Sequence, residues 1–405
     1  MKKWGLLSAL YLAQGLPYGF FTQALPVLLR EAGHSLKAIS ALSFLYLPWA
    51  LKFLWAPYLD RATNRRAWLL SFQLSGVLAA LLLSRLDLRG VPAVILSAAF
   101  AFNVIAASQD VVTDGLAIRL LGPSERGLAN AIQVGAYRIG MILGGGLLLW
   151  IYAKTSWSIM FGWMAALLAL TVFPVWQFRE PSSPRPEPAP RGGLPGTAWL
   201  ERVKAPGMLS FAALLFVYRF GDAMVSNVLG PFLKDSGLTK QDIALMKGTI
   251  GSATSVLGAV LGGWFVFRVE RRTALLAAGL AQAATFTLYV AAATGWGGSG
   301  LLWFATVCEG VLGTVATVAL FTLMMDASEP EHAGADYTLL ASFVILVNSL
   351  GTFCSAAIVD AWGYVPAFVT GTVLAAAGCV ALVVALDRRA TPARLASVWR
   401  REKAV

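Results

Sequence analysis

Twelve apolar stretches of membrane-spanning length constrain this chain more than any other feature. An α-helix needs about 20 apolar residues to cross ~30 Å of hydrocarbon. The chain is 58% hydrophobic and only 13% charged, whereas a soluble domain is about half apolar and about a quarter charged. We therefore expect an all-α membrane protein with twelve transmembrane helices near residues 4–29, 39–59, 67–84, 92–118, 128–152, 157–178, 206–232, 241–267, 273–293, 299–325, 337–359 and 364–386.

The loops between these spans carry their basic residues asymmetrically. With the N-terminus placed inside, inside segments hold 21 of the 32 Lys and Arg residues and outside segments hold 7. Cytoplasmic loops are enriched in Lys and Arg, so this asymmetry predicts that both termini face the cytoplasm. Membrane orientation accounts for the net charge of +11, because the basic residues form no clustered face of the kind that binds nucleic acid.

A Pro-rich polar segment separates two halves of six predicted spans. Such sequence cannot pack a core and is typical of an extended linker. Pro26 and Arg30 at the end of the first span are echoed by Pro231 and Lys234, at offsets of 205 and 204 residues. The echo indicates two six-helix pseudo-repeats. We predict an amino-terminal bundle at 1–178, a cytoplasmic linker at 179–205, a carboxyl-terminal bundle at 206–388 and a basic cytoplasmic tail at 389–405.

The loop between the second and third spans has an acid followed by three arginines. These residues are Asp60, Arg61, Arg65 and Arg66. Their spacing resembles the G-x-x-x-D-R-x-G-x-R-R signature of the major facilitator superfamily, with both glycines replaced. The resemblance implies the facilitator fold, in which spans 3, 6, 9 and 12 face lipid, and a cytoplasmic gate at this loop. The predicted spans 3, 6, 9 and 12 of this chain contain no Asp, Glu, Lys or Arg, as expected of helices that are exposed to acyl chains.

Charged residues inside other spans mark the expected functional region of the amino half. An ionisable group at hydrocarbon depth is costly unless it is paired or hydrated. Helical rise places Asp110, Arg138 and Lys52 about 14, 16 and 12 Å from the cytoplasmic ends of their spans. We predict that Asp110 pairs with Arg138 or Lys52. Asp114 lies one turn closer to the surface, where pairing with the loop arginines would make it part of the gate. A purely structural role for these charges stays open.

The carboxyl half has its own intramembrane charges. Arg219 and Asp222 are three residues apart, so they are neighbours on one helix face. Glu309 lies near the middle of its span with no adjacent base in the sequence, which suits a carboxyl that loads and releases a proton. We predict that Glu309 couples transport to protons, with Asp222 or Asp110 next. A static bridge between Glu309 and Arg219 is the alternative.

Further polar residues are expected to line a substrate cavity. Pro17 interrupts the first span and demands a kink or unwound backbone, which exposes polar groups around it. The cavity candidates are polar or aromatic residues beside such interruptions or charges: Gln14, Tyr18, Gln23, Gln109, Tyr137, Tyr218, Asn227 and Lys247.

The sequence offers no pattern for a metal, a cofactor or catalysis. The three cysteines lie inside apolar spans without metal-ligand spacing, and His34 and His332 lie in predicted loops. HExxH, GxSxG and a His/Asp cluster at membrane depth are all missing from the sequence, so an enzyme is not expected.

Several stretches together resemble the AmpG muropeptide permeases and their relatives, the peptide–acetyl-coenzyme A–drug transporter group. The resemblance covers most of the amino half. It rests on Gly15–Pro17, Lys52–Pro57, Ser108–Asp110 with Asp114, Glu125–Gly127 and Tyr137–Met141. Lys52, Asp110, Asp114 and Arg138 fall on matching family positions.

This resemblance implies a proton-driven importer of 1,6-anhydromuropeptides in the inner membrane of a bacterium. The expected partners are a small polar substrate, protons and the lipid bilayer, and a monomer is expected. Import of a siderophore, an acyl-coenzyme A or a drug by the same fold stays open, as does a sensor that transports nothing.

Overall fold

The computed structural model describes residues 2–31, 41–61, 64–86, 92–180, 198–388 and 393–399. Over these residues the chain is helical and contains no strand, which confirms the all-α prediction. Most of the predicted linker, residues 181–197, lies outside the described residues, as do residues 389–392 and 400–405 of the predicted tail.

Ten helical segments of the described residues are long and apolar enough to cross a membrane. They are Arg65–Leu83, Val94–Leu120, Pro123–Lys154, Trp157–Gln177, Met208–Asp235, Gln241–Arg268, Arg271–Ala293, Gly298–Ala327, Ala333–Trp362 and Tyr364–Asp387. Each overlaps one predicted span. The two remaining predicted spans coincide with helical stretches that contain polar or irregular segments, at residues 2–31 and 41–60.

The chain forms two compact units. Unit 1 comprises Met1–Leu121, Ile132–Trp199 and Glu329–Thr338, and unit 2 comprises Gly122–Ala131, Leu200–Ser328 and Leu339–Val405. Each unit thus takes a short segment from the other half of the sequence.

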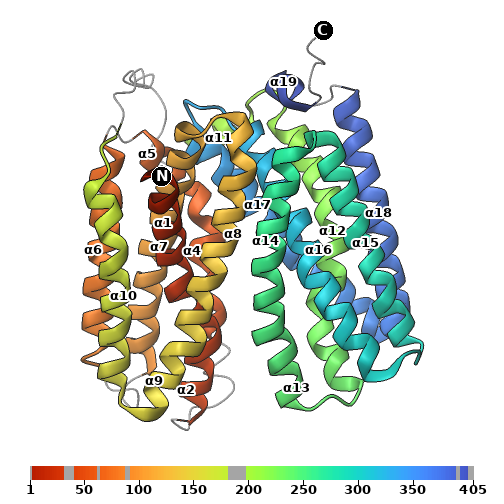
Figure 1. The fold of residues 1–405 in the computed structure, drawn as a ribbon, viewed down its shortest axis with the longest axis horizontal. Helices are drawn as coiled ribbons and strands as arrows, with labels where there is room; N and C mark the ends of the chain where they lie inside the picture. Colours follow the sequence, from red (N-terminus) through yellow and green to blue (C-terminus); the bar gives the residue numbers. More distant parts are fainter. Residues whose placement is uncertain are drawn as a thin grey trace. The chain divides into compact units, whose positions relative to one another are not determined.

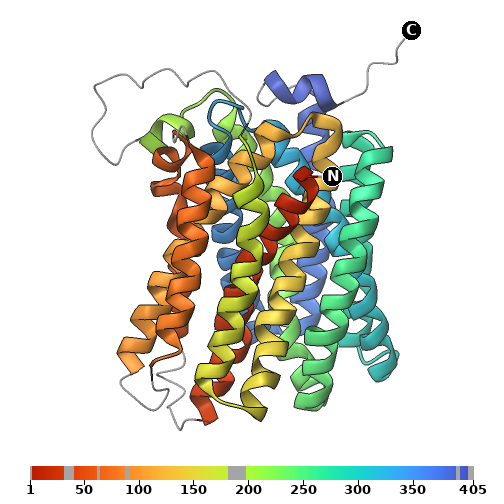
Figure 2. The same cartoon turned by 60° about the vertical axis from the view of Figure 1, so that its left-hand side comes forward.

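Unit 1 is built around the first helical stretch. The elements that lie wholly or mainly in it are α1 (Lys2–Gly19), η1 (Phe20–Ala24), α2 (Leu25–Glu31), η2 (Ala41–Tyr46), α4 (Leu47–Leu51), η3 (Lys52–Leu54), α5 (Ala56–Asp60), α6 (Arg65–Leu83), α7 (Pro92–Leu120), α8 (Arg126–Ile142), η5 (Leu143–Leu147), α9 (Leu148–Lys154) and α10 (Trp157–Gln177). α1 packs against α7 and α10, and α6 packs against α7 and α10 (Figure 1; Figure 2). Phe20, Phe102 and Phe161 fill the core.

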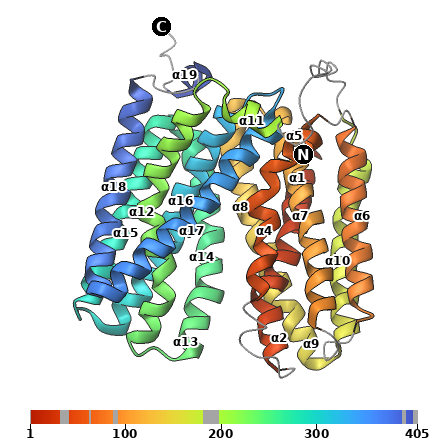
Figure 3. The same ribbon diagram turned by 180° about the vertical axis from the view of Figure 1, so that it is seen from behind.

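Unit 2 contains the remaining long helices. They are α12 (Met208–Asp235), α14 (Gly251–Arg268), α15 (Arg271–Ala293), α16 (Gly298–Ala327), α17 (Ala333–Trp362) and α18 (Tyr364–Asp387). The shorter elements are η4 (Pro123–Glu125), α11 (Ala198–Val203), α13 (Lys240–Ala244), η6 (Leu245–Ile250), η7 (Ala393–Leu395) and α19 (Ala396–Trp399). α12 and α15 both pack against α18, and α14 and α15 pack against α16 (Figure 3). Phe232, Phe286 and Phe368 are buried among them.

Four helical stretches of the described residues change their winding along their length. In the second stretch, Pro48 and Pro57 cannot donate backbone hydrogen bonds, and the chain between them tightens to the 3₁₀ segment η3, which begins at Lys52. Wider π-helical turns interrupt the stretches at η1, η5 and η6, and η6 contains Lys247. Such turns rotate the following residues and are frequent at functional sites.

Glycines let α1 and α8 approach at backbone distance. A methyl group at Gly15 would clash with the carbonyl of Tyr137, and one at Gly144 would clash with the carbonyl of Leu16. Gly146, in the same glycine triplet, has open space at this position. The small residues therefore fix the pairing of α1 with α8 and η5, as expected for close helix contacts in lipid.

We expect Gly144→Val to destabilise the protein by about 1–3 kcal/mol, because the added side chain must push α1 away. Gly146→Val is the matched control and should leave the thermal unfolding temperature in detergent nearly unchanged. Equal losses in the two variants would show that the triplet serves helix conformation and not helix packing.

Candidate functional site

A buried ion pair joins η3 to α7 in unit 1. The Lys52 ammonium contacts a carboxylate oxygen of Asp110, and the two residues are only 3% and 7% exposed. Of the two partners that the sequence allowed for Asp110, the structure selects Lys52. The ammonium also lies 5.6 Å from the ring centre of Trp49, close enough for a cation–π contact.

Two indole hydrogen bonds hold the broken helix against α7. The Trp49 ring nitrogen donates to Asn103 Oδ1 at 3.0 Å, and that of Trp55 donates to Ser108 Oγ at 3.1 Å. These bonds flank Lys52 on both sides along the chain. They fix the backbone that aims its side chain at Asp110.

Arg138 lies on α8 beside a cluster of aromatic rings. The Tyr18 ring centre is 5.9 Å from that of Tyr46, 5.7 Å from that of Trp49 and 5.5 Å from that of Tyr137. Arg138 faces Tyr18 and Tyr137 electrostatically, and it makes no ion pair with any acid of the described residues. Its charge is therefore available to a bound anion. We call Tyr18, Tyr46, Trp49 and Tyr137 the aromatic cluster.

The structure corrects the predicted partners of Asp114. The residue is 1% exposed, and its Oδ1 accepts hydrogen bonds from the Tyr11 hydroxyl at 2.9 Å and the Gln133 amide at 3.2 Å. The loop arginines do not contact it. Arg65 instead pairs with Glu180 at 2.7 Å, and Arg66 donates to the carbonyl of Trp176 at 2.6 Å.

Asp60 forms the centre of a polar contact at one end of unit 1. Arg119 Nη2 lies 2.7 Å from Asp60 Oδ1, and the backbone N–H of Ala335 donates to Asp60 Oδ2 at 3.2 Å. Arg119 also donates to the carbonyls of Pro330 and Glu331, at 2.8 and 3.1 Å. The carboxylate thus caps the N-terminus of α17, where the helix dipole favours an anion. Arg61, another of the four loop residues predicted to form the gate, is exposed.

A second contact of this kind lies within unit 2, and sequence reasoning missed it. Asp326, 1% exposed, pairs with Arg126 and with Arg271 at 2.8 Å each. Arg271 also donates to the carbonyl of Pro123. The predicted span boundaries leave both arginines in loops. The repeat of the Arg pair 65–66 at 271–272 was the available signal.

The predicted neighbours Arg219 and Asp222 do form an ion pair, at 2.5 Å. Asp222 Oδ1 accepts further hydrogen bonds from the amide of Gln282 at 2.7 Å and the hydroxyl of Ser226 at 3.1 Å. Arg219 also contacts Asn348 Oδ1 at 3.5 Å. Three side chains of unit 2 therefore satisfy this acid, and of these only Arg219 was predicted.

Glu309 has a basic neighbour in the fold. It interacts electrostatically with Lys247 of η6, and its carboxylate lies beside Gly313 together with the amide of Gln282. The sequence argument for Glu309 assumed that no base was near it. The absence of a nearby base therefore no longer favours Glu309 over the other buried carboxyls as the proton-coupling residue.

The remaining cavity candidates occupy different environments. The amide of Gln14 donates to Thr113 Oγ1 at 3.1 Å, and Gln109 is buried on the same face of α7 as Thr113. Gln23 and Asn227 are exposed. Tyr218 is only 4% exposed and packs beside Gly279 and Cys379, which places it among helices and not at a surface.

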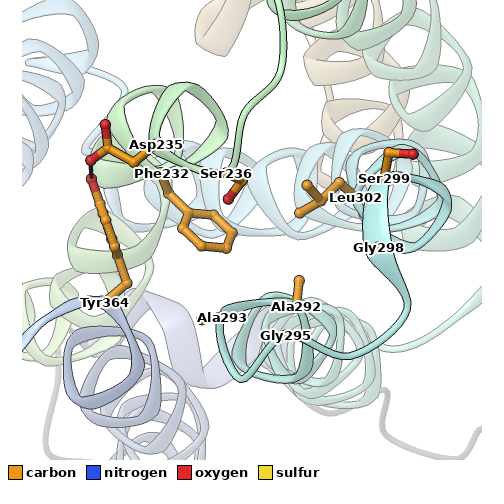
Figure 4. A pocket seen from close by; sticks show the side chains of 10 residues that line it. All are labelled: Phe232, Asp235, Ser236, Ala292, Ala293, Gly295, Gly298, Ser299, Leu302 and Tyr364. Carbon is orange, nitrogen blue, oxygen red and sulfur yellow. Dashed lines mark hydrogen bonds between the residues drawn. The ribbon is translucent and has the colours of Figure 1, made fainter.

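An open recess of about 380 Å³ lies at one end of unit 2 (Figure 4). It is lined by the end of α12, the α15–α16 connection and the start of α18, where the Tyr364 hydroxyl donates to Asp235 at 2.6 Å. None of the buried charges lines it. Within the described ranges, His, Cys, Asp and Glu form no group suited to a metal ion.

The buried charges, broken helices and gate-like contacts are features of membrane transporters. The sequence model of the family described as Major Facilitator Superfamily matches residues 7–218 of this chain, and it matches residues 211–404 as well. The chain belongs to the major facilitator superfamily. This membership places it among transporters of small molecules, not enzymes, and makes it a multi-pass membrane protein.

Relatives within the superfamily include muropeptide permeases. An anhydromuropeptide permease of Escherichia coli K12 is 29% identical over 362 residues, which are 83% of this chain and 70% of that protein. An uncharacterized protein of Haemophilus influenzae is 30% identical over 370 residues, 86% of each chain. The structure of the E. coli fucose:proton symporter matches 96% of this chain and 98% of its own with a TM-score of 0.71 at 16% identity, which shows the shared fold.

Asp110→Asn should lower the free energy of unfolding by about 3–5 kcal/mol, because it leaves Lys52 buried without a counter-charge. Adding Lys52→Met should restore much of that loss, whereas adding Arg138→Gln, the matched control, should not. Thermal unfolding in detergent measures all four proteins. Recovery with Arg138→Gln instead of Lys52→Met would refute the pairing.

Proposed function

We propose that this protein imports 1,6-anhydromuropeptides across the bacterial inner membrane by alternating access, coupled to protons. The relatives named as anhydromuropeptide permeases support the substrate. The observation that carries the proposal is the placement of Arg138, a cation with no acid partner among the described residues, beside the aromatic cluster.

The chemistry of such a substrate fits these side chains. A muropeptide combines sugar rings with a peptide that carries carboxylates. Aromatic faces pack against the apolar faces of sugar rings, and an arginine can hold a carboxylate through two hydrogen bonds.

The buried acids supply groups that can carry protons. The sequence places both histidines in predicted loops, so carboxyls are the natural proton carriers in this chain. We further propose that both termini and the 179–205 segment face the cytoplasm and that the protein acts as a monomer. Labelling from outside of a cysteine placed at Gly297, and not of one at Arg191, tests the orientation.

Vesicles that contain the purified protein should accumulate labelled anhydromuropeptide when the outside is more acidic than the inside. A protonophore should abolish the accumulation. Arg138→Gln should weaken uptake by at least about tenfold through loss of a charge-assisted contact, and Arg138→Lys should retain part of it. Arg85→Gln, at the end of α6 and away from the cluster, is the matched control.

Competition by unlabelled solutes identifies the substrate. Anhydromuropeptide should block uptake, whereas an acyl-coenzyme A and a ferric siderophore should not. Block by either of those two instead would replace the proposed substrate. Absence of any uptake in well-folded protein would favour the sensor.

A further inference from the structure

Asp114 differs in its surroundings from four other buried acids of the described residues. Asp60, Asp110, Asp222 and Asp326 each pair with an arginine or a lysine. Within the part of the chain that the structure describes, no basic side chain forms an ion pair with Asp114, although it is 1% exposed. Its hydrogen-bond partners, Tyr11 and Gln133, are neutral.

The charges around Asp114 further disfavour its ionised form. Asp110 lies one helical turn away on α7, and among the described residues the cation that acts on Asp114 is Lys52 of η3, which Asp110 engages. Tyr11 of α1 and Tyr337 of α17 are the other titratable groups that face it. Two carboxylates at i and i+4 repel each other, and burial removes the water that would solvate the second one. Binding a proton relieves both costs at Asp114.

A chain of hydrogen bonds links Asp114 to the start of α17. The Tyr337 hydroxyl donates to Gln133 Oε1 at 3.4 Å, and the Gln133 amide donates to Asp114 Oδ1 at 3.2 Å. Both donors point toward the acid. A carboxylate accepts such bonds more strongly than a neutral carboxylic acid does. Proton loading therefore weakens the chain that ends at Tyr337.

Tyr337 belongs to the segment Glu329–Thr338, which forms part of unit 1. The same segment donates the Ala335 N–H to Asp60 and offers two carbonyls to Arg119. Next to Asp114, a methyl group on Gly115 would lie 3.0 Å from the backbone of Gly334. Asp114 is therefore next in sequence to a residue of α7 that contacts the segment Glu329–Thr338.

We propose that Asp114 binds the transported proton and that its protonation releases Glu329–Thr338 from its docked position in unit 1. The proposal rests on the proposed proton-coupled transport. The Asp114 carboxylate takes a proton from the outer compartment and forms the neutral acid. Release of the segment follows, and the O–H bond breaks again when the proton leaves to the cytoplasm.

A cysteine at Ala335 reports the docking directly. Ala335 is 3% exposed in the docked segment, and alanine to cysteine is a small change. In a protein whose three native cysteines are replaced by alanine, a membrane-permeant maleimide should label Ala335→Cys roughly tenfold faster at acid than at neutral pH, as expected from weakening a charge-assisted hydrogen bond. Ala99→Cys, fully buried on α7, is the control and should stay unlabelled at both pH values.

Asp114→Asn imitates the neutral acid. It should make labelling of Ala335→Cys fast at every pH, abolish proton-driven accumulation and leave exchange of substrate across the membrane intact. Tyr337→Phe removes only the hydroxyl. It should speed labelling at neutral pH, and it keeps the test decisive if Asp114→Asn does not fold.

Two results would overturn the proposal. One is accumulation driven by a pH gradient in Asp114→Asn. The other is pH-dependent labelling of Ala335→Cys that neither variant alters. Labelling needs no substrate, so it separates this proposal from proton-coupled import itself, which fails if wild-type accumulation is insensitive to a protonophore.

Discussion

The structure depends first on the cost of an ionisable group away from water. At hydrocarbon depth a charge must find a counter-charge or hydrogen-bond partners, and those partners come from other helices. Lys52 and Asp110 join η3 to α7, and Asp222 ties α12 to α15 through Gln282. The buried charges therefore act as fixed points that align neighbouring helices within each unit.

Irregular segments of the helices position several of the polar and aromatic side chains. The prolines around η3 turn Lys52 toward Asp110, and the π-helical turn η6 carries Lys247. Glycines on α1 and α8 bring Tyr18 and Tyr137 within 5.5 Å. Part of the polar network thus lies where regular helix geometry is locally given up.

Local features of the structure could be predicted from the sequence, and contacts between distant segments could not. The spans follow from hydropathy, and the pair Arg219–Asp222 follows from its three-residue spacing. Depth alone left Lys52 and Arg138 equal as partners of Asp110, because it carries no information about helix rotation. Asp326 with Arg126 joins residues 200 positions apart, and nothing local marks it. The partners of Asp114 were predicted wrongly for the same reason, since the loop arginines had nearer partners in Glu180 and Trp176.

Asp114 is the buried carboxyl that we propose to change its protonation during transport. Infrared difference spectra of the reconstituted protein with isotope-labelled aspartate, recorded between neutral and acid pH, test this claim most directly. We expect a carboxylic-acid C=O band that grows on acidification, shifts with the label and is missing in Asp114→Asn. A band that persists in Asp114→Asn and disappears in Glu309→Gln would contradict the claim.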